Sequence, residues 1–538
     1  MTRAGSAPRA GAPRVCVLGT GGAGLVAAVA AADAGAEVTV LEKGEKVGGT
    51  TALSGGTTWL PAVEGGRDDA LSYLGSLSHG LIDPATAETF VDTGPEFLEW
   101  VQRTTPVRFH VVPGLPDYHP EHPGGKPKGG RSLDPDLFRV GALGEWAERI
   151  VPAERVPRLT LTEAPLGGGR GEVAPGTPDR ARRKAEDWRG CGHALVGGLL
   201  AALLERGITP RTGTAATDLV LRDGAVAGVR TADGTEIGAD AVVLATGGFE
   251  WDPELVAAHL RGPMTSPASV PTNTGDGLRM AMAAGSALGT MREAWWVPTV
   301  EIPGDTAFGR QRAQLVLAER TRPGSILVNA TGRRFTNEAA NYNALGGAFH
   351  QFDPGAFRYA NLPCWLVLDS AHLRRYGFLS LPPGALAPDW FTTAETLDGL
   401  GRELGLPDGE LARTVERFNA GAVEGTDPDF GRGTSAYDGW NGDQDQYPGP
   451  AATLGPLTEP PFHAVPVHSG CLGTKGGPRT TVDGQVLHVS GAPMAGLYAA
   501  GNAMAGTTGM VYGGAGGTLG PAMVFGYRAG RHAAGVRA

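Results

Sequence analysis

Cysteine is scarce in this sequence, and its few copies lie far apart. The four residues are Cys16, Cys191, Cys364 and Cys471, and no two of them form a C-x-x-C pair. Such spacing argues against a disulfide scaffold and against a structural zinc site, so we expect no metal. Free thiols suit a reducing compartment, and we expect a cytoplasmic protein.

Long apolar runs and an excess of positive charge are also lacking. No stretch of about 18 apolar residues occurs, so we expect no membrane span. Residues 1–14 contain arginines but no apolar h-region, so they do not resemble a secretory signal. The formal net charge is −10, so the excess of positive charge typical of nucleic-acid-binding proteins is lacking and we expect no nucleic acid partner.

Glycine, by contrast, is abundant. It accounts for 85 of 538 residues, about double its usual share. No Gly-X-Y period accompanies it, which excludes a collagen-like fibre. The glycines cluster in short runs, typical of loops where the backbone approaches a ligand closely. With 41% hydrophobic and 19% charged residues, the chain can also form a large core.

The N-terminal segment has the pattern of a βαβ unit. Residues 15–18 are a short apolar run that predicts a buried parallel strand. A glycine-rich turn at 19–24 leads into an alanine-rich stretch at 25–34 that predicts a helix. Residues 37–41 predict the second strand. This order is typical of a dinucleotide-binding domain.

The turn carries the dinucleotide-binding pattern G-x-G-x-x-G at Gly19, Gly21 and Gly24. The first glycine permits the tight turn, and the second lets backbone N–H groups approach a pyrophosphate at the helix N-terminus. Gly24 permits close packing of the helix on the strand. Glu42 ends the second strand, where a carboxylate can bind ribose hydroxyls. A purely structural glycine turn is the alternative.

Further glycine patches favour FAD over NAD as the dinucleotide. They lie at residues 47–56, 246–248 and 500–502. A glycine-rich segment directly after the ribose-binding acid is unnecessary for a simple NAD domain. Three patches that converge on one extended ligand fit FAD better.

The order of patterns predicts an α/β protein: a Rossmann-like FAD-binding domain with a parallel sheet, plus an inserted α+β catalytic (substrate) domain. We expect the FAD-binding domain at 1–295 and again at 469–538, with the catalytic domain at 296–468. The stretch around 157–190 is rich in Gly, Pro and Arg and predicts an irregular excursion of unassigned role. Within it, residues 180–184 predict a solvated loop or helix face.

Several motifs resemble the flavoproteins of the fumarate reductase and 3-ketosteroid Δ1-dehydrogenase superfamily. The general likeness rests on residues 19–24, 48–56, 273–277 and 324–338. The nearer likeness, to ketosteroid dehydrogenases, rests on residues 116–125, 429–433, 473–477, 498–502 and 512–527. The resemblance spans nearly the whole chain, and its C-terminal block is the most specific part.

The resemblance to fumarate reductases fails at their ligand-binding positions. Those enzymes need cations for two carboxylates, yet residues 512–520 contain neither Arg nor Lys. Their substrate histidines align with Leu472 and Gly473. The histidine that holds flavin covalently in succinate dehydrogenases aligns with Gly49, so we expect FAD to be bound non-covalently.

The ketosteroid dehydrogenase resemblance implies a role for each of four residues. It implies that Tyr512 and the backbone N–H of Gly516 bind the ketone oxygen. It implies that Tyr342 takes the α-proton as a tyrosinate, and that Tyr118 hydrogen-bonds this base. A free tyrosine has a pKa of about 10, so the base requires a lowered pKa. Ordinary packing is the alternative role for each tyrosine.

The glycine patches and the resemblance together predict the FAD contacts. They are Gly19, Gly21, Gly22, Ala23, Gly24, Glu42, Lys43, Gly49, Thr50, Thr51, Ser54, Gly55, Gly56, Ala245, Thr246, Gly247, Asp276, Gly501, Asn502, Gly517, Thr518 and Leu519. The flavin ring is expected near the N-terminus of a final helix at 521–534, whose dipole favours negative charge on the reduced ring.

The C-terminal block departs from the steroid pattern H-T-Y-P-G-P-G-A-T-I-G-P-A-M at its two prolines, which are Gly513 and Ala515 here. We expect this change to reshape the slot for the ketone. We expect the apolar walls of that slot to come from Met510, Val511, Phe249 or Trp295.

The resulting hypothesis is an FAD-dependent α,β-desaturase of a small lipophilic ketone, with an uncharged 3-ketosteroid expected first. A desaturase or ene-reductase acting on another cyclic ketone or natural product is the first alternative, and a flavoprotein electron carrier is the second. The electron acceptor and the oligomeric state do not follow from the sequence.

Overall fold

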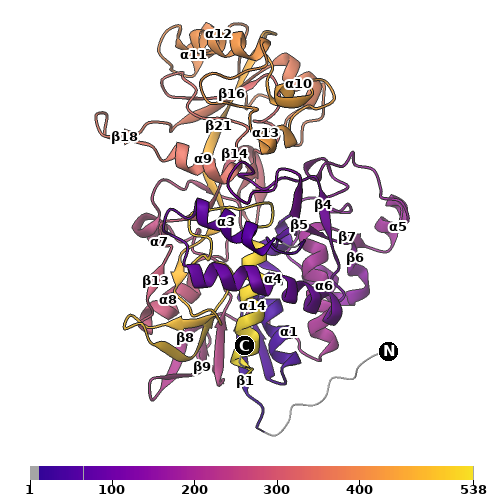
Figure 1. Cartoon of the computed structure of the whole chain (residues 1–538), viewed down its shortest axis with the longest axis vertical. Coiled ribbons are helices and arrows are strands. Elements are labelled where there is room, and N and C mark those ends of the chain that lie inside the picture. The colour runs from indigo at the N-terminus through magenta and orange to yellow at the C-terminus, as the bar shows by residue number, and fades with distance from the viewer. Residues whose placement is uncertain (1–10, 65, 537–538) are drawn as a thin grey trace.

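The computed structural model describes residues 11–64 and 66–536, and they form two units joined by long strands (Figure 1). The lower unit is built around a mostly parallel sheet, and the upper unit is α+β. Strand β14 (Ala294–Ala307) leads into the upper unit, and strand β21 (Phe462–Thr474) returns from it. The two strands pair antiparallel. The predicted fold class is therefore confirmed.

The sheet of the lower unit has five strands. Its order is β2 (Glu37–Leu41), β1 (Arg14–Leu18), β11 (Ala241–Leu244), β24 (Pro493–Ala499) and β23 (Gln485–Leu487). The first four strands are parallel, and the last is antiparallel. Their apolar side chains are buried because the sheet packs against helices and against strand β9 (Ala225–Thr231).

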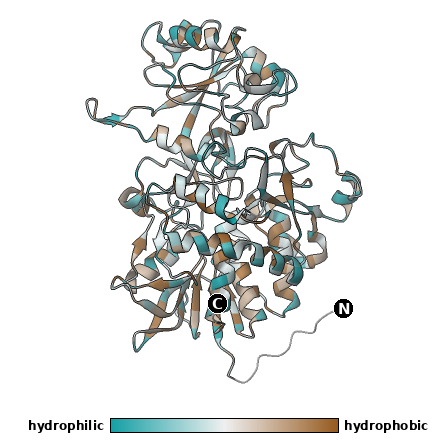
Figure 2. Ribbon diagram, viewed as in Figure 1, coloured by the Kyte–Doolittle hydropathy of each residue, from teal (hydrophilic) through white to brown (hydrophobic). Residues whose placement is uncertain are grey.

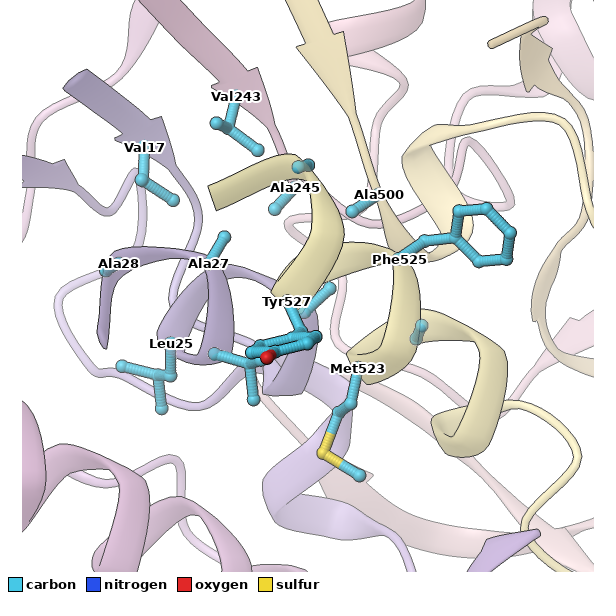
Figure 3. Packing of buried hydrophobic residues seen from close by; sticks show 14 of the residues in the cluster. Val17, Leu25, Ala27, Ala28, Val243, Ala245, Ala500, Met523, Phe525 and Tyr527 are labelled. Carbon is cyan, nitrogen blue, oxygen red and sulfur yellow. The ribbon is translucent and has the colours of Figure 1, made fainter. Parts of the chain in front are cut away.

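Two helices that start at glycine-rich loops cross on one face of this sheet. Helix α1 (Gly22–Asp33) and helix α14 (Leu519–Ala533) are in contact along their length, and Figure 3 shows their apolar side chains beneath the strands. A Cβ at Gly526 would lie 2.5 Å from the carbonyl oxygen of Ala23. Glycine therefore permits the close approach of the two helices, and so fixes both N-termini at one edge of the sheet.

Further elements surround this centre. They are α2 (Gly49–Leu53), β3 (Thr58–Trp59), α3 (Arg67–Leu77), α4 (Pro84–Thr104), β4 (Phe109–Pro113), β5 (Gly129–Pro135), β6 (Phe138–Arg139), β7 (Trp188–Arg189), α6 (Cys191–Glu205), β8 (Ala216–Arg222), β9 (Ala225–Thr231), β10 (Glu236–Gly238), α7 (Pro253–His259), β12 (Ser266–Pro267), α8 (Asp276–Ala283), β13 (Leu288–Gly289) and β22 (Gly477–Pro478). Among the described residues, no helix combines the length and the apolarity needed to cross a membrane.

The upper unit is a sheet with helices on both faces. It adds β15 (Arg310–Leu315), β16 (Ser325–Asn329), α9 (Tyr342–Phe349), β17 (Phe352–Asp353), β18 (Arg358–Tyr359), β19 (Cys364–Asp369), α10 (Ser370–Tyr376), β20 (Thr392–Ala394), α11 (Leu397–Glu403), α12 (Glu410–Val423) and α13 (Ala436–Trp440). Successive residues of a strand face opposite sides, so Leu327 packs towards α9 and α10 and Val328 packs towards α11 and α12. Figure 2 shows brown strands inside the unit and teal on its outer helices.

The predicted domain boundaries at 296 and 468 fall inside β14 and β21. Because each of these strands runs through both units, the division into 1–295, 296–468 and 469–538 remains a prediction.

The excursion at 157–190 is more ordered than its composition suggested. It contains helix α5 (Arg180–Ala185), and its side chains are not all solvated. The guanidinium of Arg183 is fully buried and donates to both carboxylate oxygens of Glu163, at 2.6 and 2.7 Å. The expectation of a solvated face is therefore wrong at this position, because a buried ion pair fixes the helix to the loop before it.

Candidate active site

A large cavity lies where the parallel strands end beneath the upper unit. Its volume is about 390 Å³. Leu18 and Leu41 at the ends of β1 and β2 line it, together with Ala245 after β11 and Ala500 after β24. The carboxyl edge of such a sheet is where α/β proteins bind their ligands.

Every predicted FAD contact lines this cavity except Gly24 and Gly517. A Cβ at Gly24 would lie 2.1 Å from the carbonyl oxygen of Gly19, so this glycine permits the helix–strand packing expected of it. A Cβ at Gly517 would lie 2.8 Å from the ring of Tyr512, so Gly517 makes room for that ring. Both positions shape the site without lining it.

The charged residues at the β2 end of the cavity are held by local contacts. The Glu42 carboxylate accepts hydrogen bonds from the N–H groups of Thr20, at 3.1 Å, and Gly44, at 2.8 Å. Burial raises the pKa of Glu42 above its ordinary value. Lys43 forms a 2.7 Å ion pair with Asp276, the first residue of α8. These two side chains line the cavity as a neutralised pair.

This donor set fits FAD. Glycines without side chains line the turn before α1, and the Glu42 carboxylate lies beside them for ribose hydroxyls. The N-terminus of α1 meets the cavity there and can receive a pyrophosphate. The N-terminus of α14, with Thr518 and Leu519, also lines the cavity, at the place where negative charge on a reduced flavin would be stabilised.

Three tyrosines from distant segments meet in the same cavity. The ring centroid of Tyr342 lies 5.3 Å from those of both Tyr118 and Tyr512, and the latter two are 5.1 Å apart. Tyr437 packs edge-on against Tyr118 at 4.8 Å and also lines the cavity. The sequence predicted that Tyr118, Tyr342 and Tyr512 belong to one site. It did not identify Tyr437, because no motif marks this residue.

The hydroxyl groups of this cluster are ordered by hydrogen bonds. Tyr118 donates to the hydroxyl oxygen of Tyr342 at 2.8 Å, as expected. Thr518 donates to the hydroxyl oxygen of Tyr512 at 3.1 Å, which leaves the Tyr512 proton available to a ligand. The N–H of Gly516, which lines the cavity, donates to none of the described residues. Tyr512 and Gly516 can therefore offer two hydrogen-bond donors.

The pKa of Tyr342 is raised, whereas a tyrosinate base requires a lowered pKa. Burial, followed by the neighbouring Tyr118, Tyr512 and Tyr437, raises this pKa well above 10. Each of these effects disfavours a tyrosinate. The protein groups around Tyr342 therefore do not supply the lowered pKa that a tyrosinate base requires.

A buried charge network fixes the chain just before Tyr342. The Glu338 carboxylate accepts hydrogen bonds from Arg334 at 2.7 and 2.8 Å and from Arg432 at 3.2 Å. Arg334 also pairs with Asp427 at 2.8 Å. Although burial alone would raise the pKa of Glu338, Arg334 and Arg432 hold it below its ordinary value.

The two positions that are proline in the steroid pattern differ in surroundings. A Cβ at Gly513 would lie 2.6 Å from the indole ring of Trp59, so this ring takes the space beside Gly513. Trp59 is fully buried and donates to Asp117 at 3.0 Å. Ala515, by contrast, lines the cavity. Only the second change therefore alters the cavity wall directly.

The apolar walls of the cavity come from residues other than the expected ones. Met510, Val511, Phe249 and Trp295 do not line it. Its larger aliphatic wall residues beyond the FAD-binding loops are Leu115, Leu161, Leu166, Val297, Leu315, Leu317 and Leu472. Trp295 instead packs edge-on against Tyr512, with the ring centroids 4.9 Å apart.

The excursion at 157–190 forms part of the cavity wall. Leu161 and Leu166 of this segment line the cavity, and so does Trp440 of the upper unit. The Trp440 indole donates to the Leu166 carbonyl oxygen at 3.0 Å. The excursion therefore joins the lower unit to the upper unit across the cavity.

Sequence reasoning also missed Arg320, a buried residue that lines the cavity. It lies outside the C-terminal block from which the absence of cations was inferred. Only the fold brings it to this place, since it follows β15 in the upper unit.

Comparison with known proteins gives consistent matches along the chain. The family model described as FAD binding domain matches residues 14–519. A 4-oxocyclohexanecarboxylate 2-dehydrogenase from Sinomonas cyclohexanicum is 41% identical, with 98% of this chain and 94% of the relative covered. A 3-oxosteroid 1-dehydrogenase from Mycobacterium tuberculosis is 39% identical, with 97% and 98% covered.

A solved structure agrees with these relatives. The 3-ketosteroid Δ1-dehydrogenase from Sterolibacterium denitrificans, in complex with 1,4-androstadiene-3,17-dione, matches with a TM-score of 0.88 and 34% identity. The match covers 97% of this chain and 99% of that one.

Fold, cavity and comparisons define a flavoprotein oxidoreductase. The chain belongs to the FAD binding domain family and is similar over nearly its full length to 3-ketosteroid Δ1-dehydrogenases. It is an FAD-dependent oxidoreductase acting on CH–CH groups, and FAD is its cofactor.

Proposed function

We propose that the protein introduces a C=C double bond next to the carbonyl of a cyclic ketone. The observation that carries this proposal is the meeting of Tyr118, Tyr342, Tyr512 and Gly516 in one cavity with the predicted FAD contacts. The two relatives support it, since their names specify 4-oxocyclohexanecarboxylate and 3-oxosteroids as substrates. Both are cyclic ketones.

Tyr512 and the N–H of Gly516 bind the ketone oxygen in this proposal. Two donors at one oxygen polarise the carbonyl, stabilise the enolate and make the α-proton acidic. Thr518 supports this role of Tyr512 because it donates a hydrogen bond to the Tyr512 hydroxyl oxygen. The Tyr512 proton is therefore directed away from Thr518. A Cβ at Gly516 would lie 2.5 Å from the Thr57 carbonyl oxygen, so only glycine fits here.

Tyr342 takes the α-proton, and Tyr118 holds its hydroxyl oxygen in place at 2.8 Å. Because burial raises the pKa of Tyr342, the tyrosinate must gain stability within the complete complex. Bound FAD supplies the acceptor for the hydride that leaves the β-carbon. The substrate thus loses one proton and one hydride, and the two electrons left by the proton form the double bond.

Product analysis tests this function. The FAD-loaded protein is incubated with 4-androstene-3,17-dione or 4-oxocyclohexanecarboxylate and an artificial electron acceptor. The products are then identified by mass spectrometry. The expected product has lost two hydrogens and carries a new double bond conjugated to the carbonyl. Recovery of only unchanged ketones, with FAD bound, would contradict the proposal.

A further inference from the structure

Two cationic side chains line the cavity, and they differ in their partners. Lys43 is paired with Asp276 at 2.7 Å. Arg320 is only 1% exposed, and no carboxylate of the described residues lies within 4.0 Å of its guanidinium. Burial of a charge without a counter-ion is costly, so such a group at a cavity wall is complementary to an anion.

The hydrogen bonds of Arg320 leave one of its nitrogens free. Nε donates to the carbonyl oxygen of Val316 at 3.1 Å, and Nη1 donates to the carbonyl oxygens of Glu338 and Ala340. Nη2 donates to none of the described residues, although the side chain lines the cavity. The guanidinium is therefore held rigidly with donor capacity to spare.

Burial and Arg432 lower the pKa of Arg320 to about 10, whereas Tyr437, Asp438 and Glu319 act to raise it. The side chain is therefore still protonated at neutral pH. Carbonyl oxygens satisfy two of its nitrogens without neutralising its charge. The positive charge remains uncompensated by any ion pair within the described residues.

Arg320 also lies close to the proposed base. Its Nη1 donates a hydrogen bond to the carbonyl oxygen of Ala340, which is two residues before Tyr342. The Cα atoms of Ala340 and Tyr342 are at most about 7.6 Å apart. Leu166 and Trp440, which also line the cavity, join the two units. A pyrophosphate of FAD belongs elsewhere, at the N-terminus of α1.

We propose that Arg320 binds a carboxylate of the substrate, so that this chain oxidises a cyclic keto acid in preference to a neutral 3-ketosteroid. The apolar leucines hold the ring, Tyr512 and Gly516 bind the ketone oxygen, and Nη2 of Arg320 receives the carboxylate. A guanidinium suits this task because its planar array of donors matches a carboxylate. The inference rests on the proposed ketone desaturation.

The test compares an acid with its neutral counterpart. Turnover of 4-oxocyclohexanecarboxylate, its methyl ester and 4-androstene-3,17-dione is measured with the FAD-loaded protein. We expect the acid to have the highest kcat/KM. In Arg320→Met the acid-to-ester ratio should fall roughly 10- to 100-fold, the effect typical of a lost hydrogen bond to a charged group. Arg320→Lys should retain part of the preference.

Arg322→Met is the matched control. Its guanidinium lies over the ring of Tyr376, 5.2 Å from the centroid, and the residue does not line the cavity. This variant should keep the wild-type acid-to-ester ratio. A binding assay that needs no turnover accompanies it: cyclohexanecarboxylate should perturb flavin absorbance at lower concentration than cyclohexanecarboxamide in the wild type, but not in Arg320→Met.

The outcomes separate this inference from the proposed function. Oxidation of neutral ketones without any preference for the acid would overturn the role of Arg320 and leave ketone desaturation standing. An equal loss of acid and ester turnover in Arg320→Met would show that Arg320 only fixes the loop before Tyr342. If no ketone is oxidised, neutral or charged, the proposed function itself fails.

Discussion

Tyr512→Phe is the substitution that most directly probes the ketone-binding end of the cavity. It removes one hydroxyl and leaves the ring, whose packing against Trp295 and Tyr118 is unchanged. In our account the ketone oxygen has two donors, Tyr512 and the N–H of Gly516. Loss of one such donor typically costs about 2.7–4 kcal/mol, which is about a 10²- to 10³-fold loss in kcat.

The cost to folding should be much smaller. Within the described part of the chain, the hydrogen bond lost is the one that Thr518 donates at 3.1 Å. Thr518 is half-buried, so a loss of about 1 kcal/mol of stability is expected. The assay is single-turnover reduction of the flavin by the ketone, with bound FAD quantified by absorbance.

Tyr498→Phe is a suitable control for this substitution. It also removes one tyrosine hydroxyl, which bonds His532 at 2.8 Å, but Tyr498 does not line the cavity. Flavin reduction in this variant should stay near the wild-type rate. A Tyr512→Phe protein that keeps its FAD and reduces it at the wild-type rate would show that Tyr512 only packs in the cavity.

Three further outcomes are expected. Tyr118→Phe removes the hydrogen bond that holds the Tyr342 oxygen in place, so kcat should fall; unchanged turnover would separate Tyr118 from the base. Glu338→Gln leaves buried arginines under-neutralised and should lower the free energy of unfolding by about 3–5 kcal/mol. Because the pKa of Glu338 is lowered in the folded state, its stabilising contribution is fully present above the unfolded pKa of about 4.3. This contribution is lost as the pH falls from there through the lowered folded pKa, and a difference in melting temperature between the two proteins that grows in acid would refute this. Acid precipitation should release all FAD into the supernatant, and flavin retained in the pellet would contradict non-covalent binding.

The FAD end of the site could be predicted from sequence because its determinants are local. Gly19 and Gly21 follow a strand at fixed spacing, and helix α1 follows them directly, beginning at Gly22, three residues before the predicted start. Glu42 lies at the end of the adjacent strand for the same reason. The backbone geometry of such a turn is encoded within a few residues.

The substrate end could be predicted only where a motif marked it. Tyr342 and Tyr512 lie beside recognisable motifs, whereas Arg320 follows an unremarkable strand and reaches the cavity through the fold of the upper unit. Similarly, Leu161 lies in an excursion whose composition gave no sign of a cavity wall. The positions of side chains that come from separate loops depend on tertiary packing, which cannot be inferred from a single sequence.

The replacement of proline by Gly513 illustrates the same limit. From the sequence, the change was expected to reshape the slot for the ketone. In the structure the indole of Trp59, far away in sequence, fills the space beside this glycine. A local departure from a pattern therefore acquired its meaning from a distant residue.

Anaerobic mixing of the oxidised holoprotein with a cyclic ketone tests the central claim most directly. Loss of the oxidised flavin absorbance, matched mole for mole by appearance of the conjugated ketone, is the predicted result. A flavin that stays oxidised with 4-androstene-3,17-dione, 4-oxocyclohexanecarboxylate and its methyl ester alike would contradict desaturation of a ketone by this protein.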